Sequence, residues 1–390
     1  MGIEELRKDD RLLTVRWTDG TSDDFHYIWL RDHIPDHTMF DPDTGERCTD
    51  FHEISLDIHP VEAHVDGKGD LRVTWPDVAA TVCYPAQWLR SHAYSPEARN
   101  VRESVFPAPK PWPFRSMEDA PVFDYDTLMH RPEVELECLR AFRTYGMAFI
   151  RSAPAAAGVV ETLTTRLGYL REVAFGRVRN IRVDPTHDSV TFSSRAVKPH
   201  IDASNYIWPI EVQFLHCIAN DAGGGDSWIV DGTAVAEQLK QENPDAYRTL
   251  ARVKVSYRVG ADAFDVRHTA PVIELDQEGN LRFVRFSNAQ RRILSVAHND
   301  VEPFYAAYHR LSEIVNDPAN QIHFRFRSGD VLMFNNHRIL HARSAFDPES
   351  GFRHLQLAST DLDMVDSRIR LLLCELKDVA EIETLLSQNG

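Results

Sequence analysis

A histidine and an aspartate stand two residues apart, at His200 and Asp202, in the β-propense run TFSSRAVKPHID. Residues i and i+2 of a strand point to the same face, so both side chains can bind one metal ion. A third ligand has to come from another strand, and His341 follows far downstream. Two histidines and one carboxylate on one octahedral face leave three positions open, as in non-haem Fe(II) oxygenases. The pattern predicts a β-rich fold around such an iron site.

Arg353 follows His341 by twelve residues and opens the alternating run RHLQLAS. On a strand its side chain shares one face with Leu355 and Leu357, so it can point into a barrel. A planar, permanently charged guanidinium can bind the far carboxylate of 2-oxoglutarate in a fork while the keto-acid end chelates iron. We therefore predict 2-oxoglutarate as the co-substrate and Arg353 as its anchor. The alternative anchors are Arg338, Arg343 and Arg368.

His337 is an alternative to His341 as the third ligand. The two histidines lie four residues apart in FNNHRILHAR and would share a face on either a strand or a helix. The spacing of four residues therefore does not show which of the two histidines is the third ligand. The LHAR context and the spacing to Arg353 favour His341 and leave His337 near the metal or on the surface.

The composition indicates an intracellular protein that folds around a sizeable core without cross-links. The chain has 390 residues, of which 43% are hydrophobic, enough for two domains. Its five cysteines are scattered and include no CxxC pair, which indicates a reducing compartment. The charged N-terminus and the lack of a long apolar run predict a cytoplasmic protein. A net charge of -16 argues against a nucleic-acid polymer or an anionic membrane as partner.

Turn signals and prolines divide the chain into two expected domains. Short alternating apolar runs such as RLLTVRW, FHYIWL and LRVTW predict a small β-rich domain over residues 1–107. The stretch FPAPKPWPF has four prolines in nine residues, too many for a helix or a central strand, and predicts a linker at 108–118. The second domain would then cover residues 119–390.

The second domain is predicted to be mainly β with flanking helices. Helical periodicity is present in VELECLRAFRTYG, AGVVETLTTRLGYL, TAVAEQLKQ and EPFYAAYHRLSEIVND. Strand-like runs are GMAFI, EVQFLHCIAN, DSWIVDG, RVKVSYRV, LRFVRFS, QIHFRFRSGDVLMFN and RHLQLAST. This pattern favours a double-stranded β-helix, or jelly roll, whose mouth can hold a buried metal.

Several strings together point to a known family. They are WLRD at Trp29–Asp32, TWPD at Thr74–Asp77, HID at His200, LHCI at Leu215, GGDSWIVDG from Gly224, LHAR at Leu340–Arg343, and RHLQ followed by DLD and SRIR. The chain resembles, over nearly its full length, the γ-butyrobetaine and trimethyllysine hydroxylase branch of the TauD-like Fe(II)/2-oxoglutarate oxygenases. The resemblance implies a small-molecule substrate, O2 and 2-oxoglutarate, and a homodimer. It also implies iron on His200, Asp202 and His341, Arg353 on 2-oxoglutarate, and Ser227 near that co-substrate.

The chain departs from this family where the substrate binds. Betaine hydroxylases hold the trimethylammonium group in an aromatic cage, because π faces attract a quaternary cation. The matching positions here are Phe175, Arg179, Phe192 and Ser359. A guanidinium at Arg179 would repel such a cation, so we expect an anionic substrate such as a carboxylate, phosphonate or phosphate, possibly a nucleotide. The further basic residues nearby are Arg177, Arg182 and Arg195.

Two further residues are candidates for the substrate pocket. Asn288 resembles a family residue near the substrate, although asparagine in such a loop is often a turn former. Tyr206 follows Asp202 closely and could line the pocket or simply pack in the core.

The small N-terminal domain lacks the family's zinc-binding cysteines. The sequence after WLRD reads HIPDHTMF. Imidazole, carboxylate and thiolate groups all bind zinc, so a substitute site could form. The candidates are His33, Asp36, His37, Cys48 and His52. Known sites have tighter, recurring spacing, so we expect a domain held by packing without zinc.

The sequence therefore predicts an Fe(II)- and 2-oxoglutarate-dependent hydroxylase of a small polar, anionic molecule. Retention of the carboxylate of Asp202 indicates oxygen transfer rather than halogenation. A hydroxylase of a trimethylammonium compound such as γ-butyrobetaine is the alternative. A zinc hydrolase could use the same ligands but would not need Arg353. A non-catalytic 2-oxoglutarate sensor is the third possibility.

Overall fold

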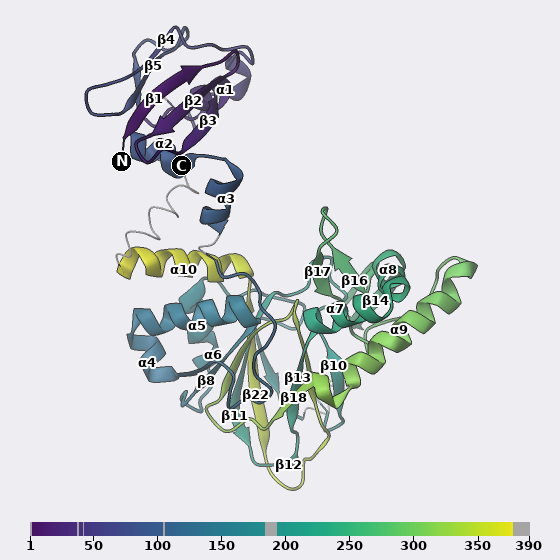
Figure 1. Cartoon of the computed structure of the whole chain (residues 1–390). Coiled ribbons are helices and arrows are strands. Elements are labelled where there is room, and N and C mark those ends of the chain that lie inside the picture. The colour runs from purple at the N-terminus through teal and green to yellow at the C-terminus, as the bar shows by residue number, and fades with distance from the viewer. Residues whose placement is uncertain (1, 37–38, 42, 104–105, 184–192, 377–390) are drawn as a thin grey trace. The chain divides into compact units, whose positions relative to one another are not determined.

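The computed structural model describes residues 2–36, 39–41, 43–103, 106–183 and 193–376 (Figure 1). The chain forms two compact units, one with Met1–Phe106 and the other with Pro107–Leu376. Among the described residues, every helix is too short or too polar to span a bilayer. Predicted Phe192 and His37 lie outside the described residues.

The N-terminal unit contains two three-stranded antiparallel sheets and short helices. The sheets are β1 (Ile3–Lys8), β2 (Leu12–Trp17), β3 (Ser22–His26) and β4 (Glu62–Val65), β5 (Leu71–Thr74), β6 (Val82–Tyr84). The helices are α1 (Tyr27–Asp32), α2 (Ala86–His92) and α3 (Pro96–Glu103). The prediction of one strand through FHYIWL is wrong, because β3 ends at His26 and α1 begins at Tyr27. Tyr27 and Leu30 are both buried, and a short apolar run of this length fits a strand or a buried helix equally well.

Two sheets form the framework of the C-terminal unit. The four-stranded sheet has the order β10 (Val197–His200), β20 (Ile339–Arg343), β13 (Ser227–Asp231), β18 (Gln321–Phe324). The six-stranded sheet has the order β7 (Val122–Asp124), β8 (Met147–Arg151), β19 (Val331–Asn335), β11 (Val212–Asn220), β22 (Arg353–Thr360), β9 (Val178–Ile181). Their pairings are antiparallel except that of β7 with β8. Residues of both sheets, such as Ile229 and Leu355, share one hydrophobic core, and the predicted jelly-roll class is confirmed.

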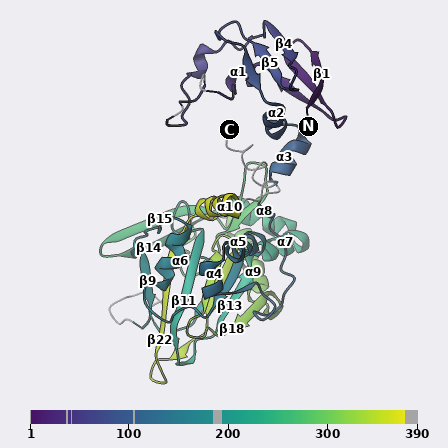
Figure 2. The ribbon, with the colours of Figure 1, turned by 90° about the vertical axis from the view of Figure 1, so that its left-hand side faces the viewer.

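Helices cover the framework in two groups (Figures 1 and 2). In one group, α4 (Tyr125–His130), α5 (Pro132–Tyr145) and α6 (Val159–Leu167) pack on the six-stranded sheet, and α10 (Leu362–Leu376) packs on α5 and α6. The other group contains α7 (Gly232–Glu242), α8 (Pro244–Arg252) and α9 (Val301–Asn316). It lies next to two hairpins. One is formed by β14 (Lys254–Ala261) and β15 (Phe264–Pro271), the other by β16 (Ile273–Leu275) and β17 (Leu281–Val284). The short pair β12 (Gly223–Gly224) and β21 (Phe346–Asp347) completes the unit. The sequence patterns predicted α5, α6, α7 and α9 but missed α4, α8 and α10.

The proline-rich stretch after Phe106 packs on the C-terminal unit. Phe114 is 3% exposed and stacks on Trp112 with ring centroids 5.3 Å apart. The indole Nε1 of Trp112 donates a hydrogen bond to the Tyr145 carbonyl at 2.7 Å. These contacts attach this part of the predicted linker to the end of α5.

Arg285 anchors the loop that follows Asp202, and its loss is expected to destabilise the C-terminal unit. Its side chain is fully buried and donates to the carbonyls of Ser204 and Tyr206, both at 2.8 Å, and from Nε to Glu274 at 2.9 Å. Arg285→Leu leaves these acceptors without a partner, so we expect a loss of roughly 3–5 kcal/mol in the free energy of unfolding. Denaturant unfolding would measure it. The control is Arg248→Leu, an exposed residue of α8 that is expected to cost under about 0.5 kcal/mol; an equal effect of both would contradict the prediction.

Candidate metal centre

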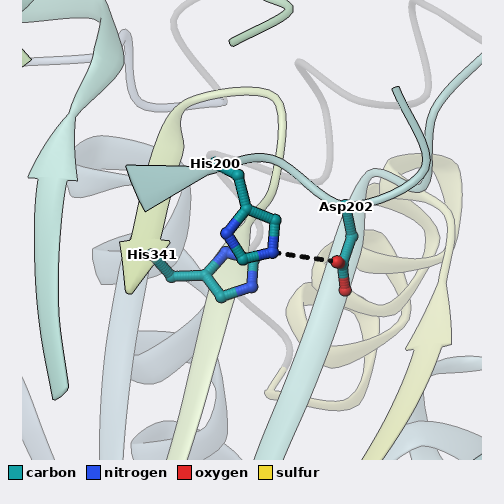
Figure 3. A group of neighbouring side chains, drawn as sticks. All are labelled: His200, Asp202 and His341. Atoms are coloured by element: carbon teal, nitrogen blue, oxygen red, sulfur yellow. Dashed lines mark ion pairs between the residues drawn. The ribbon is translucent and has the colours of Figure 1, made fainter. Parts of the chain in front are cut away.

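His200 and His341 lie directly opposite each other on neighbouring strands of the four-stranded sheet (Figure 3). His200 is the last residue of β10 and His341 the middle residue of β20. Their ring centroids are 4.3 Å apart. The antiparallel register therefore brings together two histidines that are far apart in the sequence.

Asp202 reaches the same place from a turn, not from a strand. Our prediction that one strand holds both His200 and Asp202 is wrong, because β10 ends at His200. The backbone of Asp202 is held instead by the fully buried Asn336. The Asn336 Oδ1 accepts from the Asp202 N–H at 2.8 Å, and its Nδ2 donates to the Asp202 carbonyl at 3.0 Å. The side chains still converge, with 3.4 Å between His200 Nε2 and Asp202 Oδ1.

These three side chains form a group that fits a metal ion. Their ligand atoms all lie within 4.8 Å of one another, and no other such group occurs in the described part of the chain. His200 Nδ1 lies 2.9 Å from the Lys198 carbonyl, so a proton on Nδ1 leaves Nε2 free to bind metal. The buried His341 Nδ1 has no partner among the described residues. Burial, followed by the proximity of His200, lowers the pKa of His341 to about 3, so this imidazole is neutral, as a metal ligand has to be.

The carboxylate of Asp202 is ionised although its side chain is only 16% exposed. Arg179 Nη2 donates to its Oδ2 at 3.0 Å, and Gln213 Nε2 donates to the same oxygen at 2.9 Å. Burial raises the pKa of Asp202, but the charge of Arg179 and the hydrogen bond with His200 outweigh it and hold the pKa well below its usual range. Two imidazoles and one carboxylate are the donor set that suits Fe(II) with open positions.

Arg353 lines the cavity of these ligands and is a buried cation without an acidic partner. It is 5% exposed, and no described carboxylate forms an ion pair with it. Burial and the nearby Arg343 lower its pKa to about 9, so it remains charged at neutral pH. Gly225 has φ +76, and a Cβ there would lie 3.1 Å from Arg353 Nε, so glycine makes room for the guanidinium. A buried, unpaired guanidinium is suited to a ligand carboxylate.

The alternative arginines have other contacts. Arg338 is paired with Asp231 at 2.6 Å, and Arg368 with Glu135 at 2.7 Å, and neither lines the cavity. Arg343 does line the cavity, and its Nη2 donates to the carbonyls of Ser193 at 2.8 Å and Arg195 at 2.5 Å. Arg353 is thus the cavity arginine with no hydrogen-bond acceptor recorded among the described residues.

The remaining predicted residues lie at different distances from the cavity. Ser227 and Arg179 line it. Ser359 is buried on β22, on the same face as Arg353, but is not part of the cavity wall. Tyr206 is half-buried, and its hydroxyl accepts from the Ala174 N–H at 3.0 Å.

Phe175 and Asn288 lie outside the cavity wall. Phe175 is 37% exposed and packs edge-on against Phe264, with ring centroids 5.1 Å apart. Asn288 is exposed, and its Oδ1 accepts from Arg291 at 3.3 Å. Of the expected basic cluster, Arg179 faces the ligands, whereas Arg177, Arg182 and Arg195 are exposed.

His337 is placed away from the metal centre. It packs between Phe283 and Trp208, with ring centroids 4.3 and 4.8 Å away. Burial lowers its pKa to about 4. Its role is to fill the core, whereas His341 faces His200.

The histidines and acids of the N-terminal unit do not gather into a metal site within the residues described there. His33 stacks on Trp29 at 4.6 Å, and its Nδ1 lies 2.8 Å from the Trp29 carbonyl. The buried Ile34 and Met39 fill the core after the WLRD helix.

Sequence reasoning missed two residues that hold Asp202, namely Asn336 and Gln213. Asn336 follows β19 directly, and an Asn-Asn pair between a strand and a histidine is a turn signal that could have drawn attention to it. Gln213 is a polar residue in the mostly apolar run VQFLHCI, and such a residue signals a buried polar group that needs a partner.

The chain is similar to known dioxygenases over most of its length. The model for the taurine catabolism dioxygenase TauD, TfdA family matches residues 109–358, and that for the gamma-butyrobetaine hydroxylase-like N-terminal region matches residues 4–90. The gamma-butyrobetaine dioxygenase of Pseudomonas sp. (strain AK-1) is 34% identical over 92% of this chain and 93% of its own. The human gamma-butyrobetaine dioxygenase is 29% identical over 93% of this chain and 94% of its own, and the bovine mitochondrial trimethyllysine dioxygenase is 28% identical over 89% and 82%. The solved structure of the PvcB protein from Pseudomonas aeruginosa matches 64% of this chain and 91% of its own, at 20% identity and a TM-score of 0.47.

The chain belongs to the TauD/TfdA family of dioxygenases. It is an Fe(II)- and 2-oxoglutarate-dependent dioxygenase, so the predicted reaction class and cofactors are confirmed, in place of a zinc hydrolase or a sensor. Enzymes of this family use a small-molecule substrate, 2-oxoglutarate and O2. Iron, when bound with 2-oxoglutarate, supplies the activation of O2 for hydroxylation.

Proposed function

We propose that this protein hydroxylates a small anionic molecule, with His200, Asp202 and His341 as the iron ligands. Arg353 is proposed to hold the far carboxylate of 2-oxoglutarate, with Ser227 beside it. The support is the convergence of the three ligand atoms within 4.8 Å next to a buried arginine that has no acidic partner among the described residues.

The charge of the cavity wall carries the proposal of an anionic substrate. Among its described residues, the charged side chains are Asp202 and the three arginines Arg179, Arg343 and Arg353, so the wall is net positive. A ferrous ion adds two positive charges, and 2-oxoglutarate removes two. The loaded site therefore still attracts an anion and repels a cation. The guanidinium of Arg179 has five N–H groups, one of which donates a hydrogen bond to Asp202, so the other N–H groups can bind a substrate oxygen.

A trimethylammonium compound is the second candidate, because relatives of this chain are named for γ-butyrobetaine and trimethyllysine. Such a group needs aromatic faces around it. Of the described positions that match the cage, Arg179 and Ser359 have no aromatic ring, and the ring of Phe175 packs against Phe264. The anionic substrate is therefore the better supported of the two.

Replacing Arg179 with leucine is expected to raise the KM for the anionic substrate by roughly 10- to 100-fold, because a hydrogen bond to a charged group contributes about 1.5–3 kcal/mol. The measurement is substrate-dependent release of succinate, after a panel of carboxylates, phosphonates, nucleotides and betaines has found the substrate. Because Arg179 also contacts Asp202, substrate-independent decarboxylation of 2-oxoglutarate is measured in parallel to report on the metal centre.

The control is Arg182→Leu, which removes an exposed arginine just after β9. It is expected to leave both rates unchanged. Turnover of γ-butyrobetaine by the unmodified enzyme, with no response to anionic compounds, would show that the second candidate is correct.

The remaining expectations stand as part of the proposal. From the sequence alone, we also propose substrate contacts for Phe175, Phe192, Tyr206, Asn288 and Ser359, of which Phe192 lies outside the described residues. A homodimer in the cytoplasm is proposed from the family resemblance and from five cysteines that are all free thiols.

A further inference from the structure

Gln213 is a buried polar side chain in an apolar setting. It is fully buried in β11, the strand between β19 and β22, opposite Phe334 and Ser359. The residues that share its face of β11 are Leu215 and Cys217, both apolar. A glutamine in such a place costs stability unless its amide is hydrogen-bonded. Its amide is therefore expected to have a hydrogen-bond partner.

The amide of Gln213 holds the metal-side carboxylate. Its Nε2 donates to Asp202 Oδ2 at 2.9 Å, the oxygen that also accepts from Arg179 at 3.0 Å. The amide has to face the carboxylate with its NH2 group, because the opposite orientation would set two oxygens against each other. The Oε1 of Gln213 is buried without a partner among the described residues, which is the cost of this orientation.

Because of these two donors, the two oxygens of the Asp202 carboxylate have different surroundings. Oδ2 is occupied by Gln213 and Arg179, while Oδ1 lies 3.4 Å from His200 Nε2 and faces the other ligands. A free carboxylate can rotate about χ2 and offer either oxygen or both. With Oδ2 held, the oxygen left for a metal is Oδ1.

We propose that Gln213 is a positioning residue of the metal centre. Together with Arg179 it fixes the plane of the Asp202 carboxylate, so that one oxygen binds the metal and a second coordination position is not covered by Oδ2. This inference rests on the proposed function, because it takes Asp202 as an iron ligand. Gln213 adds no charge, so its effect is on orientation, whereas Arg179 also balances the negative charge.

The test is binding of Co(II) to the metal-free enzyme, without turnover. Gln213→Met keeps the length and much of the volume of the side chain but removes the donor. We expect its Co(II) affinity, measured by competition with a chelator, to fall roughly tenfold and the Co(II) absorption spectrum to change. The matched control is Gln356→Met, another buried glutamine of the same sheet, whose Nε2 donates to Asn180 at 2.9 Å. Its Co(II) affinity and spectrum are expected to stay those of the unmodified enzyme.

The possible outcomes separate this inference from the proposed function. If Gln213→Met binds Co(II) with unchanged affinity and spectrum, Gln213 does not position the ligand. If instead Asp202→Ala binds Co(II) as well as the unmodified enzyme, Asp202 is not a ligand and the proposed site itself fails. Should Gln213→Met not fold, Gln213→Asn keeps a polar amide that is one methylene too short, and the same loss in affinity is expected of it.

Discussion

Alanine in place of His200 is expected to abolish Fe(II)-dependent consumption of 2-oxoglutarate. The imidazole is one of three groups whose ligand atoms lie within 4.8 Å, and two remaining ligands hold a ferrous ion poorly. Because a catalytic metal contributes several kcal/mol to the rate, we expect a loss of at least roughly 10³-fold. Release of CO2 from 2-oxoglutarate at saturating Fe(II) and ascorbate would measure it, together with the affinity for Co(II).

The control for this variant is His337→Ala, because His337 is also half-buried and lies only four residues from His341. It is expected to lower the free energy of unfolding, since the ring packs on Phe283, but to leave the Co(II) affinity intact. Full activity of a folded His200→Ala enzyme would refute the proposed ligand set. If His337→Ala lost Co(II) binding and His200→Ala kept it, His337 rather than His200 would be a metal ligand.

The sequence predicted those elements whose pattern is local. β11, β13, β19 and β22 have alternating or continuous apolar runs bounded by turn residues, and each was found. The helix α1 was misread because its apolar residues Tyr27 and Leu30 occur within a run of six, where strand and helix periods cannot be distinguished. The rest of the fold depends on which strands pair, and this information is not local.

The candidate site, like the fold, could be predicted only in part from local sequence patterns. His200 and Asp202 were found from their spacing, but the reason given, one continuous strand, was wrong. The turn at Asp202 depends on Asn336, which is 134 residues away in the sequence. Arg179 was predicted to face the substrate, yet its hydrogen bond to Asp202 joins two segments that no short pattern connects. Side chains that hydrogen-bond to a proposed metal ligand, rather than to the metal itself, can thus be identified only once the fold is known.

Arg353 is a buried cation without an acidic partner among the described residues, and each of these features lowers the stability of the fold. A bound anion offsets both. The guanidinium is buried, and burial with the nearby Arg343 lowers its pKa to about 9. No described acid is paired with it, although the buried arginines Arg31, Arg285 and Arg338 are each paired with a carboxylate. A cavity built this way is destabilised when empty and stabilised by a dianion. This predicts opposite effects of one substitution on stability and on binding.

Arg353→Leu is expected to weaken 2-oxoglutarate binding by about two orders of magnitude, because a bidentate, charge-assisted pair is lost and each such hydrogen bond contributes about 1.5–3 kcal/mol. The free energy of unfolding of the ligand-free enzyme is expected to stay constant or rise, because an apolar side chain replaces a buried, unpaired charge. Titration of the Mn(II)-loaded enzyme with 2-oxoglutarate and denaturant unfolding measure the two effects. In the unmodified enzyme, affinity is expected to persist through neutral pH, because the guanidinium stays charged there.

Arg343→Leu is the matched comparison, because Arg343 lines the same cavity but holds the carbonyls of Ser193 and Arg195. Leucine there leaves two backbone acceptors without their donor, so this variant should be less stable while its affinity for 2-oxoglutarate changes less than tenfold. If Arg343→Leu lost the co-substrate and Arg353→Leu kept it, the anchor would be Arg343. If both variants bound 2-oxoglutarate normally, the carboxylate would have to bind elsewhere, and the unpaired charge of Arg353 would be left without a function.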